Sequence, residues 1–287
     1  MNGGFDGNVG GYRRDLAFIH DAGFRHYALG AAPGLLRILK THKIKRGLVI
    51  DLGCGSGRWA CELNRAGYDV LGVDQSRAMI RMARRNAPAS RFMVASLFET
   101  ELPECGAITS IGECLNYCFD KTSNRRGLAH LFKRCYGALR PGGVLICDFA
   151  TLHRRPKGGV REHRSSGRGW KITARTAARG TRMIRREIVA LRRVGGAYRC
   201  SRENHVLRLH SASEIARDLK RCGFRVRLVR RWGGFRLPRG IEGIIAVKPL
   251  AAIVRKAPPS QNEDGAPGKS KAKRDPSPFG LRMTTRD

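Results

Sequence analysis

Residues 51–57 read Asp-Leu-Gly-Cys-Gly-Ser-Gly and place three glycines at alternate positions. Glycine has no Cβ, so such a loop can turn sharply and let its backbone approach a ligand closely. Asp51 precedes these glycines, and Asp74 follows them along the chain. A carboxylate has two acceptor oxygens, which suit the two hydroxyl groups of a ribose. The loop and the two acids therefore predict one pocket for a ligand that contains a ribose.

The segments around this loop alternate between strands and helices until about residue 150, which is typical of a parallel sheet with crossover helices. The expected strands are 47–52, 68–73, 91–95, 107–112 and 144–149, and the expected helices between them are 57–66, 75–86 and 123–139. In such a sheet the ligand lies at the carboxyl ends of the strands, next to the loop after the first strand. Residues 53–57 form that loop.

The pattern changes after Thr151. Apolar residues alternate over 170–178, 181–194 and 197–209, which predicts an antiparallel meander. A helix with the capping box Ser211 and Glu214 follows, and then two strands at 224–231 and 241–247. Residues 15–40 are expected to form one or two helices, broken between Gly30 and Gly34. The predicted fold class is α/β, a Rossmann-like doubly wound, seven-stranded, mostly parallel sheet with an inserted antiparallel β meander after strand five.

Three segments resemble motifs of the class I S-adenosylmethionine-dependent methyltransferases. The residues within these segments are similar to those of the bacterial small-molecule type. Residues 49–57 are similar to the first motif of that family, 72–76 to its ribose-binding segment, and 139–145 to the segment before strand five. The GxGxxG loop of dinucleotide-binding proteins would need glycine at position 58, where this chain has Arg58. The resemblance covers about residues 47–150 and implies S-adenosylmethionine as the cofactor.

The resemblance also implies which residues bind the cofactor. Asp51, Gly53 and Gly55 would contact its methionine portion, and Asp74 would bind its ribose. The other expected cofactor contacts are Cys54, Gly57, Gln75, Ser76, Met79, Ser96, Leu97, Gly112 and Glu113. The family often has an acid where Ser96 stands. Taken alone, Asp74 could instead be the N-cap of the helix that follows it.

Methyl transfer requires an acceptor held in line with the S–CH₃ bond, and it requires a base where the nucleophile must lose a proton. The candidate bases are His20, Glu113 and His153, although for each of them alone the residue type favours an ordinary polar side chain over a base. Candidate shaping groups are Tyr12, Asn116 and Tyr117. Arginines of the predicted meander could bind an anionic acceptor or could form a solvated strand face, and they are Arg175, Arg185, Arg186, Arg192 and Arg193.

The composition is strongly basic, with 56 Lys and Arg against 23 acidic residues and a net charge of +33. Such a surface attracts nucleic acids and other anions. The nine cysteines lack the paired spacing of a zinc site, so no metal is predicted. No apolar run of about 18 residues is present to span a membrane, and residues 1–11 lack the regions of a signal peptide. The expected location is the cytoplasm.

The expected organisation has three parts. Residues 1–45 form a helical segment over the cofactor site, residues 46–250 form the methyltransferase domain with a β lid at about 153–210, and residues 251–287 form a disordered basic tail. The expected function is methyl transfer to a small molecule or metabolite, which could be anionic. One alternative is an RNA or DNA methyltransferase, which the charge favours. Against it, residues 112–115 read Gly-Glu-Cys-Leu where base-modifying amino methyltransferases have Asn-Pro-Pro-Tyr or Asp-Pro-Pro-Tyr. The other alternative is a catalytically inactive cofactor-binding protein.

Overall fold

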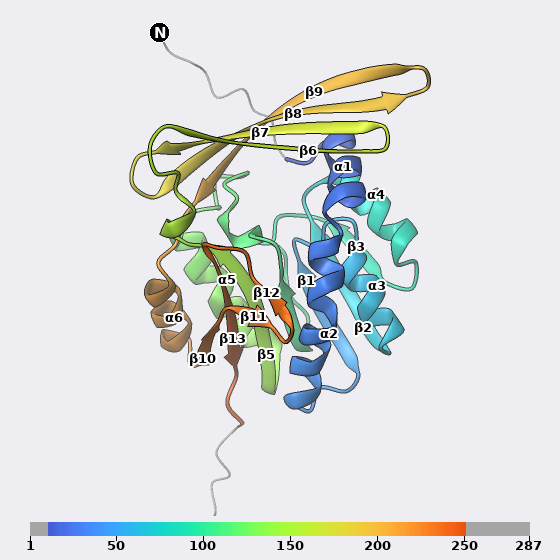
Figure 1. Ribbon diagram of the computed structural model, residues 1–287. Coiled ribbons are helices and arrows are strands. Elements are labelled where there is room, and N and C mark those ends of the chain that lie inside the picture. The colour runs from blue at the N-terminus through green and yellow to red at the C-terminus, as the bar shows by residue number, and fades with distance from the viewer. Residues whose placement is uncertain (1–10, 251–287) are drawn as a thin grey trace, which may run out of the picture. The chain divides into compact units, whose positions relative to one another are not determined.

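The inner strands of the central sheet are short apolar runs, because helices bury them on both faces. The computed structural model describes residues 11–250, so the predicted tail at 251–287 lies outside the described residues. The seven strands of this sheet are β1 (Gly47–Leu52), β2 (Tyr68–Asp74), β3 (Arg91–Val94), β4 (Cys105–Ser110), β5 (Leu139–Ala150), β10 (Arg225–Val229) and β13 (Ile241–Val247). Their spatial order is β10-β13-β5-β4-β1-β2-β3 (Figure 1).

Strands β1 to β5 run parallel to one another, and β13 pairs antiparallel with both β5 and β10. This topology confirms the predicted Rossmann-like fold class. The predicted strand bounds agree with the structure to within a few residues. The largest difference is at β5, which begins at Leu139, directly after the preceding helix, and therefore includes the turn at Gly142.

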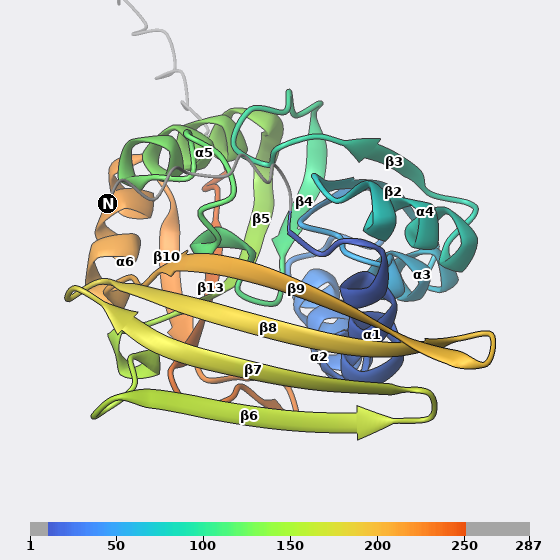
Figure 2. The same cartoon turned by 90° about the horizontal axis from the view of Figure 1, so that it is seen from above.

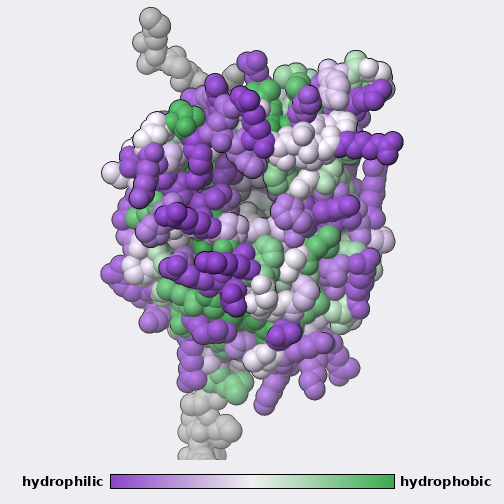
Figure 3. Space-filling view, in the orientation of Figure 1, coloured by the Kyte–Doolittle hydropathy of each residue, from purple (hydrophilic) through white to green (hydrophobic). Residues whose placement is uncertain are grey.

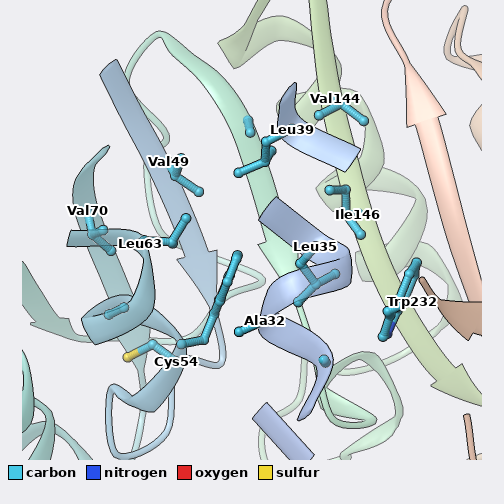
Figure 4. Packing of buried hydrophobic residues seen from close by; sticks show 14 of the residues in the cluster. Ala32, Leu35, Leu39, Val49, Cys54, Leu63, Val70, Val144, Ile146 and Trp232 are labelled. Atoms are coloured by element: carbon cyan, nitrogen blue, oxygen red, sulfur yellow. The ribbon is translucent and has the colours of Figure 1, made fainter. Parts of the chain in front are cut away.

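Helices cover both faces of the sheet. Successive side chains of a strand point to opposite faces, so alternate residues pack against the helices on one face and the rest against those on the other. The helices are α1 (Arg14–Phe24), α2 (His26–Thr41), α3 (Arg58–Arg65), α4 (Arg77–Asn86), α5 (Arg125–Ala138) and α6 (Ala212–Arg221). On one face Val49 packs with Leu35 of α2 and Leu63 of α3 (Figure 4). On the other face Ile50 packs with residues of α5 and α6.

Helix α2 continues through the segment where the sequence predicted a break, so that prediction is wrong. The break lies instead at Arg25, between α1 and α2. A Cβ on Gly34 would lie 2.1 Å from the backbone oxygen of Trp232, and one on Gly30 would lie 2.8 Å from the ring of Phe235. The glycines are needed for close packing against the short hairpin of β11 (Arg231–Trp232) and β12 (Phe235–Arg236), not for a turn.

A second, four-stranded antiparallel sheet is inserted between β5 and α6, as predicted (Figures 1 and 2). Its strands are β6 (Val160–Gly167), β7 (Trp170–Arg179), β8 (Met183–Val194) and β9 (Ala197–Arg208), and we call it the meander. The sequence predicted three of these strands and missed β6, which has Val160 as its one large apolar residue and is mostly exposed on both faces. Trp170 and Ile188 of the meander pack on Leu16 and Ile19 of α1.

Shorter elements complete the described chain. Two 3-10 turns, η1 (Cys114–Asn116) and η2 (Leu152–Arg154), follow β4 and β5. The predicted capping box of α6 is not formed, because the Ser211 hydroxyl lies 2.8 Å from the Ser213 hydroxyl and Glu214 pairs with Arg182. Within residues 11–250 no helix has the length and apolarity to cross a membrane. Hydrophilic side chains cover most of the face in Figure 3.

Candidate functional site

A cavity of about 580 Å³ lies between the glycine loop, helix α1 and the meander. Its walls include Gly53 and Asp74 from the carboxyl ends of the parallel strands, His20 from α1, and Ile172 and Ile188 from the meander. The carboxyl edge of the sheet is where ligands of this class of fold bind. The cavity therefore lies where the sequence predicted it, and the inserted meander forms its opposite wall.

The glycine loop presents bare backbone to this cavity. Gly55 has a φ of 53°, and a Cβ at that position would meet nothing within 4 Å, so a ligand can approach the backbone there. Gly53 and Cys54 also line the cavity. Gly57 does not, because it packs on helix α4, where a Cβ would lie 2.9 Å from the Cα of Ala83.

Asp74 holds the loop in this shape. Its Oδ2 accepts a hydrogen bond from Gly55 N at 2.9 Å, and its Oδ1 accepts one from Ser76 N at 2.8 Å. Each oxygen keeps a further lone pair for a ligand. Asp74 is not the N-cap of α4, because Ser76 has that position and accepts from Met79 N at 3.1 Å. Burial raises the pKa of Asp74.

Asp51 is buried at the base of the cavity. It accepts a hydrogen bond from Thr109 Oγ1 at 2.8 Å, and Thr109 in turn accepts one from Trp59 Nε1 at 3.1 Å. Burial raises the pKa of Asp51 to about 7, and the nearby charge of Asp74 adds to this effect. A cation at this end of the cavity would favour the ionised form of Asp51.

The remaining predicted cofactor contacts divide into two groups. Gln75, Met79, Leu97, Gly112 and Glu113 line the cavity. Ser76 and Ser96 do not, because each makes hydrogen bonds that fix the surrounding backbone. The Ser76 hydroxyl donates to Tyr12 O at 2.7 Å, and the Ser96 hydroxyl donates to Asp120 Oδ2 at 2.9 Å.

The structure brings two of the three candidate bases into the cavity. His20 and Glu113 line it, whereas His153 lies on η2 in a separate surface pocket with Lys157 and Arg239. Burial lowers the pKa of His20 to about 4, so its imidazole is neutral at pH 7. His153 is an exposed side chain that follows β5, and proximity in sequence to that strand end was the only signal for it.

Sequence reasoning missed Tyr27, which lines the cavity, and Asp148, which is outside the lining but bonds residues that are part of it. Asp148 Oδ1 accepts from Gly112 N and Glu113 N, each at 2.8 Å, and Asp148 Oδ2 accepts from Tyr27 OH at 2.9 Å. These bonds hold Glu113 at a φ of 62°, which is uncommon for a residue other than glycine. Burial raises the pKa of Asp148 to about 6. The signal in the sequence that could have identified Asp148 is that it is an acidic residue near the end of a buried strand.

Aromatic side chains form one wall of the cavity. Tyr12 and Tyr117 share a hydrogen bond between their hydroxyl groups at 2.8 Å, and Tyr117 stacks on Phe119 with ring centroids 4.8 Å apart. Arg186 Nη1 donates to Tyr117 OH at 3.2 Å. Asn116, a predicted shaping group, lies outside the cavity lining, because it bonds Ala150 through both its amide nitrogen and its amide oxygen.

The five predicted arginines lie on different faces of the meander. Arg186 lines the cavity. Arg175 and Arg185 pair with Glu162 and Glu187, and Arg192 pairs with Asp15 of α1. The fifth, Arg193, is exposed. Arginines that line the cavity but were not predicted to do so include Arg154 and Arg161.

Helix α1 is connected both to the glycine loop and to the meander. Asp21 accepts hydrogen bonds from Ser56 Oγ at 2.7 Å and from Arg58 Nε at 2.7 Å. At the other end of the helix, Asp15 accepts from Arg199 Nε at 2.6 Å. The chain just before α1 bonds the meander as well, through Tyr12 N and Glu203 at 2.8 Å. Helix α1 therefore closes one side of the cavity.

Comparison with known proteins agrees with this geometry. Residues 49–143 match a family model described as a methyltransferase domain. A ubiquinone biosynthesis O-methyltransferase of Alkalilimnicola ehrlichii is 34% identical over 116 residues, which cover 38% of this chain and 43% of that relative. A putative methyltransferase of Geobacillus sp. is 28% identical over 112 residues, which cover 37% of this chain and 43% of the relative. The match thus spans less than half the length of these curated relatives.

Solved structures share the fold over most of the chain. An S-adenosylmethionine-dependent methyltransferase from Clostridium acetobutylicum has a TM-score of 0.69 at 19% identity, over 82% of this chain and 98% of that one. A sugar N-methyltransferase from Streptoalloteichus sp. has a TM-score of 0.68 at 19% identity, over 87% of this chain and 97% of that one. The chain has the class I S-adenosylmethionine-dependent methyltransferase fold, and the match to the methyltransferase family model lies within this fold at residues 49–143.

The residues around the glycine loop fit S-adenosylmethionine, the cofactor of this class. That molecule carries a sulfonium and an ammonium group, and the acids Asp51 and Asp74 lie at this end of the cavity. The open backbone at Gly55 leaves room for close approach. Met79 and Leu97 add apolar surface.

Proposed function

We propose that this protein transfers the methyl group of S-adenosylmethionine to a small-molecule acceptor bound in the cavity. The observation that carries the proposal is that residues of the glycine loop, helix α1 and the meander line one cavity. An acceptor in that space is enclosed by protein on several sides, which suits a small molecule better than a polymer. Similarity to a ubiquinone biosynthesis O-methyltransferase and to a sugar N-methyltransferase supports a small acceptor.

The main role of the protein in this reaction is to position the acceptor. The bound cofactor supplies a methyl group that is already activated by the sulfonium, so the protein must align the acceptor and exclude water. Helix α1 and the meander enclose the space, and the aromatic wall of Tyr12, Tyr117 and Phe119 gives it flat apolar surface. Neutral His20 and the carboxyl group of Glu113 are the groups within the cavity that we propose accept a proton from the nucleophile.

Calorimetry with S-adenosylmethionine and S-adenosylhomocysteine tests the cofactor half of the proposal. We expect both to bind at one site per chain, with no requirement for added metal. Incorporation of labelled methyl groups into a metabolite extract then tests the acceptor half. Binding of neither compound would refute the proposal, and labelling of RNA or DNA in place of small molecules would favour the nucleic acid alternative.

We expect the affinity for S-adenosylmethionine to rise with pH and then level off. Burial raises the pKa of Asp51 to about 7, so below that pH the free protein holds this group protonated and uncharged. A cationic ligand favours the carboxylate, so binding becomes tighter by up to about tenfold per pH unit until the pH passes about 7. Titrations between about pH 5.5 and 7.5 measure this slope. Asp51→Asn should remove the pH dependence of the affinity that is centred near pH 7. An unchanged pH dependence in that variant would contradict the role of Asp51.

A further inference from the structure

Three arginines lie near the carboxylate of Glu113 in the wall of the cavity. Glu113 Oε1 lies 3.6 Å from Arg154 Nη2 and 3.7 Å from Arg186 Nη2. Both distances exceed that of a good hydrogen bond, so neither arginine binds Glu113 tightly. Arg161 on β6 also lines the cavity and lies near the other two arginines. We call Arg154, Arg161 and Arg186 the arginine cluster.

The arginine cluster has more positive charge than its surroundings neutralise. Glu113 is one carboxylate against three guanidinium groups. The other acid on this wall, Glu162, already pairs with Arg164 and Arg175, each at 2.6 Å. Burial lowers the pKa of Arg161, and the charges of Arg154 and Arg186 lower it further. An anion placed among these groups would relieve that repulsion.

An unused hydrogen-bond donor at the same place also indicates a missing ligand. Among the described residues, Arg154 Nε is buried without a hydrogen-bond partner, and an oxyanion can accept from it. A buried polar atom without a partner is costly, so it commonly marks a place where a ligand or water completes the bonding. A guanidinium group binds the two oxygens of a carboxylate or phosphate through two parallel hydrogen bonds.

The cavity therefore has two chemically different ends. The acids Asp51 and Asp74 lie at the glycine loop, whereas Arg154 comes from η2 and Arg161 and Arg186 come from the meander. We propose that the acceptor carries an oxyanion, a carboxylate or a phosphate, that binds to the arginine cluster and so directs the rest of the acceptor toward the glycine loop. This inference rests on the proposed function, because it names the class of acceptor for the same site.

The test uses inorganic phosphate and acetate as probes, titrated by calorimetry into the full chain saturated with S-adenosylhomocysteine. We expect at least one probe to bind, and the stronger of the two identifies phosphate or carboxylate as the preferred group. The double variant Arg154→Gln with Arg161→Gln should weaken that binding at least about tenfold, since each loses a charge-assisted pair. Absence of binding by both probes would overturn the proposal.

A matched control separates the cavity from the basic surface. Arg185 and Arg193 are on β8 near Arg186, but both side chains are exposed and neither lines the cavity. Arg185→Gln with Arg193→Gln removes the same number of charges from the meander and should leave probe binding unchanged. Equal weakening by both double variants would mean that the probes bind only through general surface charge, which would overturn the proposal.

The carboxylate of the cofactor is the other anion that could bind the arginine cluster, and the same variants test it. We expect the affinity for S-adenosylhomocysteine to be unchanged in Arg154→Gln with Arg161→Gln. A parallel loss of that affinity would assign the cluster to the cofactor and overturn the proposal. If the unaltered protein binds no S-adenosylhomocysteine, the proposed function fails, and titration of the probes into the protein alone still tests the arginine cluster.

Discussion

Replacing Asp74 with alanine should weaken binding of S-adenosylhomocysteine by about 100-fold or more. The carboxylate accepts from Gly55 N and Ser76 N, so its loss frees the glycine loop as well as removing the proposed contacts to the ribose. Hydrogen bonds to charged groups contribute about 1.5–3 kcal/mol each, and the loss of two such bonds corresponds to about two orders of magnitude in affinity. Calorimetry on the purified variant measures the change.

Asp69 provides the control for that prediction. It lies on the same strand β2 as Asp74, but its side chain is exposed and lies outside the cavity lining. Asp69→Ala should leave the affinity unchanged. Asp74→Asn keeps the shape of the side chain and one acceptor oxygen, so it should lie between the two. An affinity for Asp74→Ala equal to that of Asp69→Ala would show that Asp74 is not part of the cofactor site.

The second large effect is on stability, where Gly34→Ala should lower the free energy of unfolding by about 3 kcal/mol. Alanine in the middle of a helix normally stabilises a protein by about 1 kcal/mol relative to glycine. Here the new Cβ would lie 2.1 Å from Trp232 O and 2.8 Å from Gly233 N, and backbone atoms cannot rotate away as a side chain does. The overlap therefore outweighs the gain in helix propensity. Denaturant unfolding followed by circular dichroism measures it.

Gly137 is the matched control for this substitution. It lies inside helix α5, and a Cβ there would meet nothing within 4 Å. Gly137→Ala should therefore raise the free energy of unfolding by about 0.5 kcal/mol, which is opposite in sign to Gly34→Ala. Equal effects at the two positions would contradict the close contact between helix α2 and the β11–β12 hairpin.

The sequence was sufficient for the features that local patterns determine. The glycine loop and Asp74 could be placed because strand, turn and helix follow in order around residues 47–66. The break predicted between Gly30 and Gly34 was wrong because glycine has two uses, in turns and in close packing, and Trp232 lies about 200 residues away along the chain. Strand β6 was missed because its two faces are both mostly exposed, which leaves no apolar alternation to detect.

The candidate site was predictable at its cofactor end and much less so at its acceptor end. A motif names Asp51 and Asp74, whereas Arg161 enters the cavity only because the register of β6 against β7 places it opposite Thr176 on the inner face. Arginine is abundant in this chain, so its position in sequence does not distinguish the inner face from the outer one. His153 shows the converse error, since nearness to the end of β5 did not bring it into the cavity.

The attachment of helix α1 at both ends has a kinetic consequence. Asp21 links this helix to the glycine loop, and Asp15 links it to the meander. Opening of these bonds would let α1 move away from the cavity that it lines, which would ease the exit of a bound molecule. We therefore expect Asp21 to influence how long the demethylated product stays bound more than how tightly it binds at equilibrium, so that release of the product, and not the chemical step, limits turnover.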